Sequence, residues 1–336
     1  MSTALYHTRY TTAAIAGRVL DGLDAYADIV RRPMLKEEDF EPSRDLSIQA
    51  LEGLDDDPRS RVLILLRQFH WPSPYNRNTM GEIEHLKALT LDECRSAFRQ
   101  RYAPQKAILS LAGDVDPAEA KQRVEAAFGD WRVEPLPDVT AVAPREAYHF
   151  SHQDSEQTHI GIACATTPET HDDYYVARVA SEILSGGMSG RLFTEIREKR
   201  GLCYSVGTSY SPLRDRASLL GYAGSSNERA QATLDAFIAE LKRLSEGVTA
   251  DEVDRAKVGL RASTIMSGES SPARAGAIAS DYFTRGRLRS LNEIEQQIAA
   301  VTVDRVNDYV RKTPLGPFTI VIVGPKELKV DVNVLA

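Results

Sequence analysis

The chain has 336 residues, 42% hydrophobic and 26% charged, which is ordinary for a globular protein long enough for about two domains. Its net charge of −7 comes without a basic stripe, which argues against nucleic-acid binding, and no apolar run approaches the length of a membrane span. The three cysteines, Cys94, Cys164 and Cys203, are widely spaced and odd in number, which favours buried, reduced thiols over a disulfide framework or a zinc knuckle.

In chain order, the first half contains a helical pattern from Leu23 (LDAYADIVRRP), a capping box from Thr90 (TLDEC) and a β-rich run that ends at Gly113 (AILSLAG). A proline-rich stretch without helical periodicity follows and predicts a linker at 134–146. The sequence therefore predicts a first domain at 1–133 and a second at 147–336.

The second half predicts strands and helices in alternation. Strands are expected at 158–166, at 203–210 and in the run that ends at Gly324, and helices at 172–184 and 234–244. A second capping box begins at Thr249 (TADEV). This mixture predicts the α+β class, with sheet-plus-helix layers.

The two halves also resemble each other, and their landmarks keep a nearly constant separation of 211, 212 and 211 residues. These landmarks are Leu23 with Leu234, Thr90 with Thr302, and Gly113 with Gly324. By this offset, roughly the first 65 residues of the second half have no counterpart in the first half. We therefore expect the first domain to lack its N-terminal strands and helix, so that it is completed by a partner, is rearranged, or belongs to a fragment.

Metal-binding patterns are missing from the sequence. None of the seven histidines belongs to an H-x-x-E-H or H-E-x-x-H arrangement. Glu82 and His85 form half of a carboxylate–histidine motif and are interpreted as a surface pair, and His149 with His152 as part of an edge strand. In SGGMSGR, Gly186 is expected to end one helix and Ser189 to begin the next, rather than to form a phosphate loop.

The segment TEIREKRGLCYSV, at 194–206, carries the candidate site. Leu192 and Ile196 share one helix face, Arg197 lies at its margin, and Gly201 ends the helix. Tyr204 follows in a predicted strand, seven residues after Arg197. The spacing allows two interpretations: a dipole-compensating arginine with a core tyrosine, or two donors that converge on a peptide carbonyl.

At this point the sequence resembles the pitrilysin-type (insulinase-like, inverzincin) metallopeptidases. LSGGMSGRLFTEIREKRGLCYSV resembles the signature of that family's later domain, and LTLDECRSAFRQRYAPQKAILSLAGDVD resembles the end of its first domain. The resemblance implies two similar α+β domains that face each other around a peptide chamber. It implies zinc held by H-x-x-E-H and a distant glutamate, and a substrate-binding pair that corresponds to Arg197 and Tyr204.

The chain departs from that pattern at the metal site. The segment that would carry H-x-x-E-H is missing, and the place of the distant glutamate is taken by Ala50, with Glu52 nearby but pointing elsewhere along the helix. The resemblance therefore implies no metal ligands and no catalytic residue in this chain. It implies a bacterial, peptidase-like subunit, cytoplasmic or periplasmic, that is inactive alone.

Three functions remain open on this basis. In the first, the chain is the zinc-less partner subunit of a heterodimeric peptidase, and a homologous subunit carries the zinc while Arg197 and Tyr204 hold the peptide substrate. In the second, it is a non-catalytic structural or peptide-binding scaffold. In the third, it is a truncated form of an active zinc peptidase.

Overall fold

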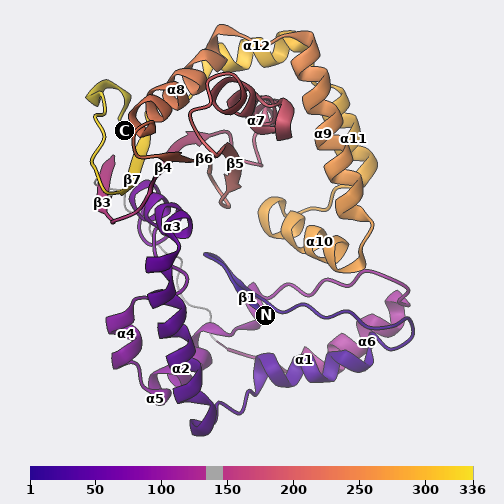
Figure 1. Cartoon of the computed structure of the whole chain (residues 1–336). Helices are drawn as coiled ribbons and strands as arrows, with labels where there is room; N and C mark the ends of the chain where they lie inside the picture. Colours follow the sequence, from indigo (N-terminus) through magenta and orange to yellow (C-terminus); the bar gives the residue numbers. More distant parts are fainter. Residues whose placement is uncertain (134–146, 336) are drawn as a thin grey trace. The chain divides into compact units, whose positions relative to one another are not determined.

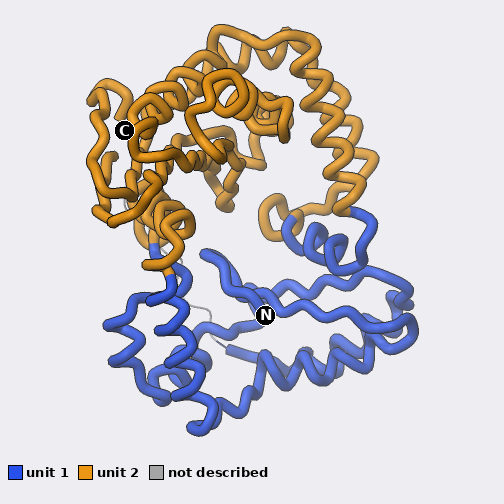
Figure 2. The backbone as a smooth tube through the Cα atoms, in the orientation of Figure 1, with its two compact units in different colours: residues 1–53, 77–140, 268–280 blue, residues 54–76, 141–267, 281–336 orange. Residues whose placement is uncertain are grey.

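The computed structural model describes residues 1–133 and 147–335, and they pack as two units (Figures 1 and 2). Unit 1 comprises residues 1–53, 77–140 and 268–280, and unit 2 comprises 54–76, 141–267 and 281–336. The units are not consecutive halves of the chain, because residues 54–76 of the first half pack in unit 2. The predicted linker at 134–146 lies outside the described residues.

Unit 2 is built on a five-stranded sheet in the order β3–β7–β4–β6–β5. β3 and β7 are parallel, and the other neighbours are antiparallel. The strands are β3 (Tyr148–His152), β4 (Gln157–Thr166), β5 (Ser205–Pro212), β6 (Ala217–Ser226) and β7 (Thr319–Gly324). The predicted α+β class and the strands expected in the second half are confirmed, as is the edge strand that contains His149 and His152.

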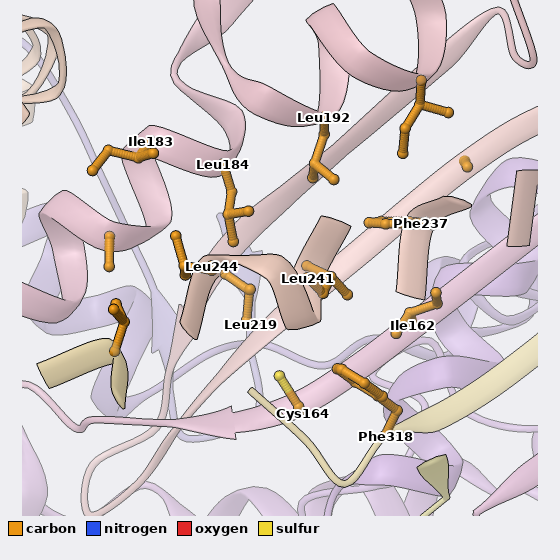
Figure 3. Packing of buried hydrophobic residues seen from close by; sticks show 14 of the residues in the cluster. Ile162, Cys164, Ile183, Leu184, Leu192, Leu219, Phe237, Leu241, Leu244 and Phe318 are labelled. Carbon is orange, nitrogen blue, oxygen red and sulfur yellow. The ribbon is translucent and has the colours of Figure 1, made fainter. Parts of the chain in front are cut away.

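Apolar side chains alternate between the two faces of this sheet. In β7, Ile320 and Ile322 belong to the main core, whereas Val321 and Val323 belong to a second cluster on the opposite face. Figure 3 shows Leu184, Leu192 and Phe237 gathered in the main core. The helices that cover this core are α7 (Tyr174–Ser185), α8 (Ala230–Arg243), α9 (Ala250–Gly268), α11 (Leu291–Ala299) and α12 (Val303–Lys312).

The second face of the sheet is covered by α3 (Pro58–His70), which contacts β4 and β7 (Figure 1). Val62 and Leu66 are fully buried there. Gly161 of β4 makes this close approach possible, because a Cβ atom at that position would lie 3.3 Å from both of these side chains. A helix from the first half of the sequence therefore covers one face of the sheet formed by the second half.

Unit 1 is mostly helical. Its helices are α1 (Asp21–Arg31), α2 (Glu37–Glu52), α4 (Ile83–Ala88), α5 (Leu91–Arg101), α6 (Pro117–Phe128) and the first turns of α10 (Ser271–Arg285). Its only described strands are the short β1 (Ser2–Thr3) and β2 (Thr8–Arg9). Short 3-10 turns in the two units are η1 (Gly53–Asp56), η2 (Pro104–Lys106), η3 (Gly187–Ser189), η5 (Leu244–Glu246) and η6 (Val332–Val334). Within the described ranges, no helix is both long and apolar enough to cross a bilayer.

The strand expected at 107–113 is wrong. The segment has no regular secondary structure and pairs with no described strand, and Ile108 and Leu109 remain 39% and 45% exposed. Its counterpart, β7, is held between β3 and β4, and the first half offers no equivalents of those neighbours among its described residues. A β-rich sequence without partners cannot form a ladder. Both capping boxes, by contrast, form as expected, at Thr90 with Glu93 and at Thr249 with Glu252.

His70 ends α3 on the second face of the sheet. Its Nδ1 lies 3.0 Å from Thr319 Oγ1 of β7, and its Nε2 lies 2.6 Å from Ser218 Oγ of β6. Burial lowers the pKa of His70 to about 4. The neutral imidazole therefore ties α3 to two strands, and its protonation opposes the packing of α3.

We predict that unit 2 loses stability as the pH falls from about 6.5 to about 4. The pKa of His70 is lower in the folded than in the unfolded chain, so the unfolded chain binds the extra proton in this window. The contribution of His70 is complete above pH 6.5, and its loss amounts to about 3 kcal/mol near pH 4.

The measurement is urea unfolding at several pH values, followed by the fluorescence of Trp71, which is 2% exposed, in a Trp131→Phe background. The stability difference between wild type and His70→Gln should shrink as the pH falls. The same comparison with His152→Gln, an exposed histidine of unit 2, should stay flat. A constant difference for His70→Gln would contradict the prediction.

Candidate functional site

Arg197 is carried by a short π-helix, η4 (Phe193–Glu198), where the sequence predicted an ordinary helix end. The wider turn is visible in the backbone bond from Lys199 N to Thr194 O, at 3.0 Å. Leu192 and Ile196 are fully buried, so the predicted apolar face is confirmed and fixes this turn on the main core. π-helical turns are rare in proteins, and many of those that occur lie at functional sites.

The start of this helical segment is held by a partly buried ion pair. Arg191 Nε lies 2.6 Å from Glu252 Oε1, and its Nη2 donates to the Gly247 carbonyl oxygen at 2.8 Å. The hydrogen bond from Arg191 lowers the pKa of Glu252 to about 2. Gly186 ends α7 as expected, but Ser189 lies in a 3-10 turn and does not cap the next helix.

The Arg197 side chain is exposed and lies against an aromatic ring. Its guanidinium carbon is 4.7 Å from the centre of the Phe193 ring, one turn earlier. No described residue accepts a hydrogen bond or forms an ion pair with Arg197. The side chain borders an open hollow of about 300 Å³, lined by Ser185, Gly187, Met188, Phe193, Arg197, Ser205 and Val206.

Tyr204 lies just after the turn that follows η4. Gly201 has a φ of +60°, which suits glycine, and its N–H donates to the Arg197 carbonyl oxygen at 3.0 Å. The Tyr204 N–H donates to the Gly224 carbonyl oxygen of β6 at 2.9 Å, so its backbone is joined to the sheet before β5 begins. Its side chain is 66% exposed, and its hydroxyl has no hydrogen-bond partner among the described residues. The interpretation of Tyr204 as a core tyrosine is therefore wrong.

Arg197 lies in η4, before the turn at Gly201, and Tyr204 lies just after this turn, so both predicted donors belong to one short segment of the chain. Arg197 lines the hollow itself, whereas Tyr204 adjoins it through its neighbour Ser205. Sequence reasoning missed Phe193, although its position four residues before Arg197 on the same helical segment was a usable signal. It also missed Ser185, whose Oγ accepts from the Thr208 N–H at 2.6 Å and fixes β5 beside the end of α7.

The two buried cysteines of unit 2, Cys164 and Cys203, are poor nucleophiles. Burial raises the pKa of Cys203 to about 11, although Arg197 acts in the opposite direction. Burial also raises the pKa of Cys164 to about 12. Nucleophilic attack needs the thiolate, so neither thiol is suited to catalysis at neutral pH.

The zinc site that the resemblance implies does not fit the residues present. Ala50 presents an exposed methyl group on α2 where a carboxylate ligand is expected. Glu82 and His85 form the predicted surface pair, with 3.2 Å between Oε2 and Nδ1. Within the described part of the chain, no three His, Cys, Asp or Glu side chains are grouped closely enough to hold a metal ion.

Known proteins match this chain over most of its length. An uncharacterized zinc protease of Mycobacterium leprae is 27% identical over 98% of this chain and 78% of its own length. A structure described as the peptidase M16 inactive domain from Pseudomonas fluorescens aligns with a TM-score of 0.79 at 23% identity, over 92% of this chain and 75% of that one. A chain of complex III2 from Candida albicans aligns with a TM-score of 0.79 at 19% identity, over 95% and 80%.

The family comparison is more specific. The sequence profile of the peptidase M16 inactive domain matches residues 88–260, which is just over half of the chain. This range contains the signature segment with Arg197 and Tyr204. The chain therefore belongs to the M16, or pitrilysin-type, family of peptidases, as a peptidase-like member that matches the family's inactive domain.

Proposed function

We propose that the chain is a zinc-less subunit of an M16 peptidase, which contributes Arg197 and Tyr204 to a peptide chamber shared with a zinc-bearing homologous subunit. One observation carries the proposal: both donors lie on one core-anchored segment, point outward and have no acceptor among the described residues. The alternative interpretation, a dipole-compensating arginine with a core tyrosine, requires a buried Tyr204, but its side chain is exposed.

The geometry supports substrate binding by these two side chains. A guanidinium and a phenol are hydrogen-bond donors that hold a peptide carbonyl and stabilise negative charge that develops on its oxygen. The π-helix and the Phe193 ring restrict Arg197 before a substrate arrives, which lowers the entropic cost of binding. The apolar walls of the adjoining hollow, Met188 and Val206, suit a side chain of the same peptide.

The metal chemistry is assigned to the other subunit. The described residues offer no metal-ligand set, so this chain's role is to bind and orient the peptide. A zinc ion bound by H-x-x-E-H in the partner would supply an activated water. In the proposed chamber, Arg197 and Tyr204 act on the carbonyl group of the same peptide bond.

A scaffold function is the second candidate, and the fold likeness to a chain of complex III2 from Candida albicans favours it. In that case the exposed pair has no role in hydrolysis. The two candidates differ in one measurable property, because only the first requires Arg197 and Tyr204 for the activity of an assembled complex.

We predict that Arg197→Ala and Tyr204→Phe each lower kcat/KM about 100-fold or more in a complex reconstituted with a zinc-bearing homologue. The loss follows from removing one donor to the reacting carbonyl. The assay is cleavage of a fluorogenic peptide by the wild-type and mutant complexes, after chromatography has shown that both subunits are present.

Matched controls are exposed residues of the same types in unit 2. Arg200→Ala changes an arginine three residues further on, whose partner is Glu240 at 3.7 Å, and Tyr282→Phe changes another exposed tyrosine. Both should leave activity within about threefold. Full activity in both site variants would refute the assigned role. Stable complexes without hydrolysis for every homologue tested would favour the scaffold.

We also predict that the isolated chain retains far less than one zinc ion per molecule after equilibration with zinc and exhaustive dialysis. Ala50→Glu should not change this, because one carboxylate without two imidazoles does not complete a tetrahedral site. Atomic spectroscopy measures the metal content, with the zinc-bearing homologue as the positive control. Retention of one equivalent by the wild-type chain would contradict this assignment.

A further inference from the structure

A group of arginines and tyrosines gathers in unit 2, away from the Arg197 segment. The tyrosines come from the start of α7 and from β5, and the arginines from α7, the end of α10 and the loop before α11. Each arginine lies over one tyrosine ring, at 5.0 to 5.9 Å from its centre. The pairs are Arg178 with Tyr210, Arg285 with Tyr174, and Arg289 with Tyr175.

One of these arginines is fully paired. Arg289 Nη2 lies 2.5 Å from Asp281 Oδ1, and its Nη1 donates to Tyr175 Oη at 2.6 Å. Burial works against the charge, but the hydrogen bonds that Arg289 donates to Asp281 outweigh it and raise the pKa of Arg289. Arg289 and Asp281 therefore neutralise each other and leave no acceptor for a second arginine.

Arg285 is the exception to ordinary burial of charge. Its Nε and Nη2 atoms are shielded from solvent, and no described residue accepts a hydrogen bond from either. These two nitrogens form the edge of the guanidinium that grips a carboxylate with two parallel hydrogen bonds. Its flat face is occupied by Tyr174, which is only 8% exposed.

Arg178 adds a second cation to this group. It makes no ion pair or hydrogen bond with described residues and lies over Tyr210, whose ring is 5.8 Å from that of Tyr174. The nearby acids do not form ion pairs with these cations. After the larger effect of burial, the charge of Glu169 contributes to the raised pKa values of Tyr174 and Tyr210. Burial raises the pKa of Glu182, and the charge of Arg178 opposes this rise without an ion pair between the two.

We propose that Arg285, supported by Arg178, forms a carboxylate-binding subsite walled by Tyr174 and Tyr210. Leaving the buried edge of a guanidinium without an acceptor is costly, and a planar anion bound at this edge removes that cost. The subsite extends the proposed function. It rests on that function for one point only, namely that the carboxylate belongs to a bound peptide. The group is either a peptide C-terminus or an acidic side chain, and small model compounds separate the two.

The test uses the thermal unfolding of the full chain alone, at constant ionic strength set with sodium chloride. The probes are N-acetylglycine for a C-terminal carboxylate, N-acetylglutamate α-methylamide for a side-chain carboxylate, and neutral N-acetylglycinamide. At ten times its dissociation constant, a bound carboxylate should raise the Tm by about 3 °C. The neutral amide should leave the Tm unchanged.

The variants give the effect a sign. Without carboxylate, Arg285→Met should raise the Tm, because it removes an unpaired charge, and it should abolish the response to carboxylates. Arg285→Lys keeps the charge but loses the two-pronged edge, and should weaken carboxylate binding at least tenfold. Arg255→Met, which removes an exposed arginine of α9 paired with Asp251, should respond like wild type.

A response to only one carboxylate probe identifies the source, and a response to both supports a general carboxylate subsite. Equal shifts with all three probes, an unchanged response in Arg285→Met, or a larger shift with inorganic phosphate would each overturn the inference. The experiment needs neither a partner subunit nor hydrolysis. A failure of the peptidase proposal would therefore leave its outcome readable, and the reverse also holds.

Discussion

The structure of unit 2 depends on one constraint: its sheet carries apolar side chains on both faces, and both faces need a cover. The helices of the second half cover one face, while α3, from the first half of the sequence, covers the other. The contact is close because Gly161 has no side chain toward Val62 and Leu66. His70 ends this helix with hydrogen bonds to β6 and β7. Residues 54–76 are thus part of the domain that carries the candidate site, although the chain runs through unit 1 before and after them.

The same core determines the candidate site. Leu192 and Ile196 are buried in this core. The π-helix η4, which contains Ile196, places Arg197 at the hollow. The Gly201 N–H then closes the turn on the Arg197 carbonyl oxygen, and the Tyr204 N–H donates to Gly224 of β6. Both donors lie on one core-anchored segment, which supports the proposal that they hold the same carbonyl. The position of the two donors is therefore a consequence of the packing of the apolar residues beside them.

Much of this was readable in the sequence, for identifiable reasons. The strands and helices of the second half follow apolar periodicity, and both capping boxes form, because these are local interactions. The strand expected at 107–113 does not form because a strand needs neighbouring strands to pair with. The described residues of the first half contain no equivalents of β3 and β4. The exposure of Tyr204 could not be read either, since alternation along a strand begins only at Ser205. The position of α3 depends on tertiary contacts, which no local pattern in 58–70 reveals.

Four arginines of unit 2 show how burial and pairing together separate structural from functional charge. Arg191 and Arg289 are partly buried and have carboxylate partners, so they hold elements together and have little capacity left for a ligand. Arg197 has no ion-pair partner among the described residues but is exposed, so its charge remains hydrated at little cost. For the two buried nitrogens of Arg285 the described part of the chain offers no acceptor, so the fold bears an electrostatic cost that an acceptor would relieve. Stacking on an aromatic ring is common to Arg197, Arg285 and Arg289, so it cannot distinguish these roles, whereas the missing acceptor does.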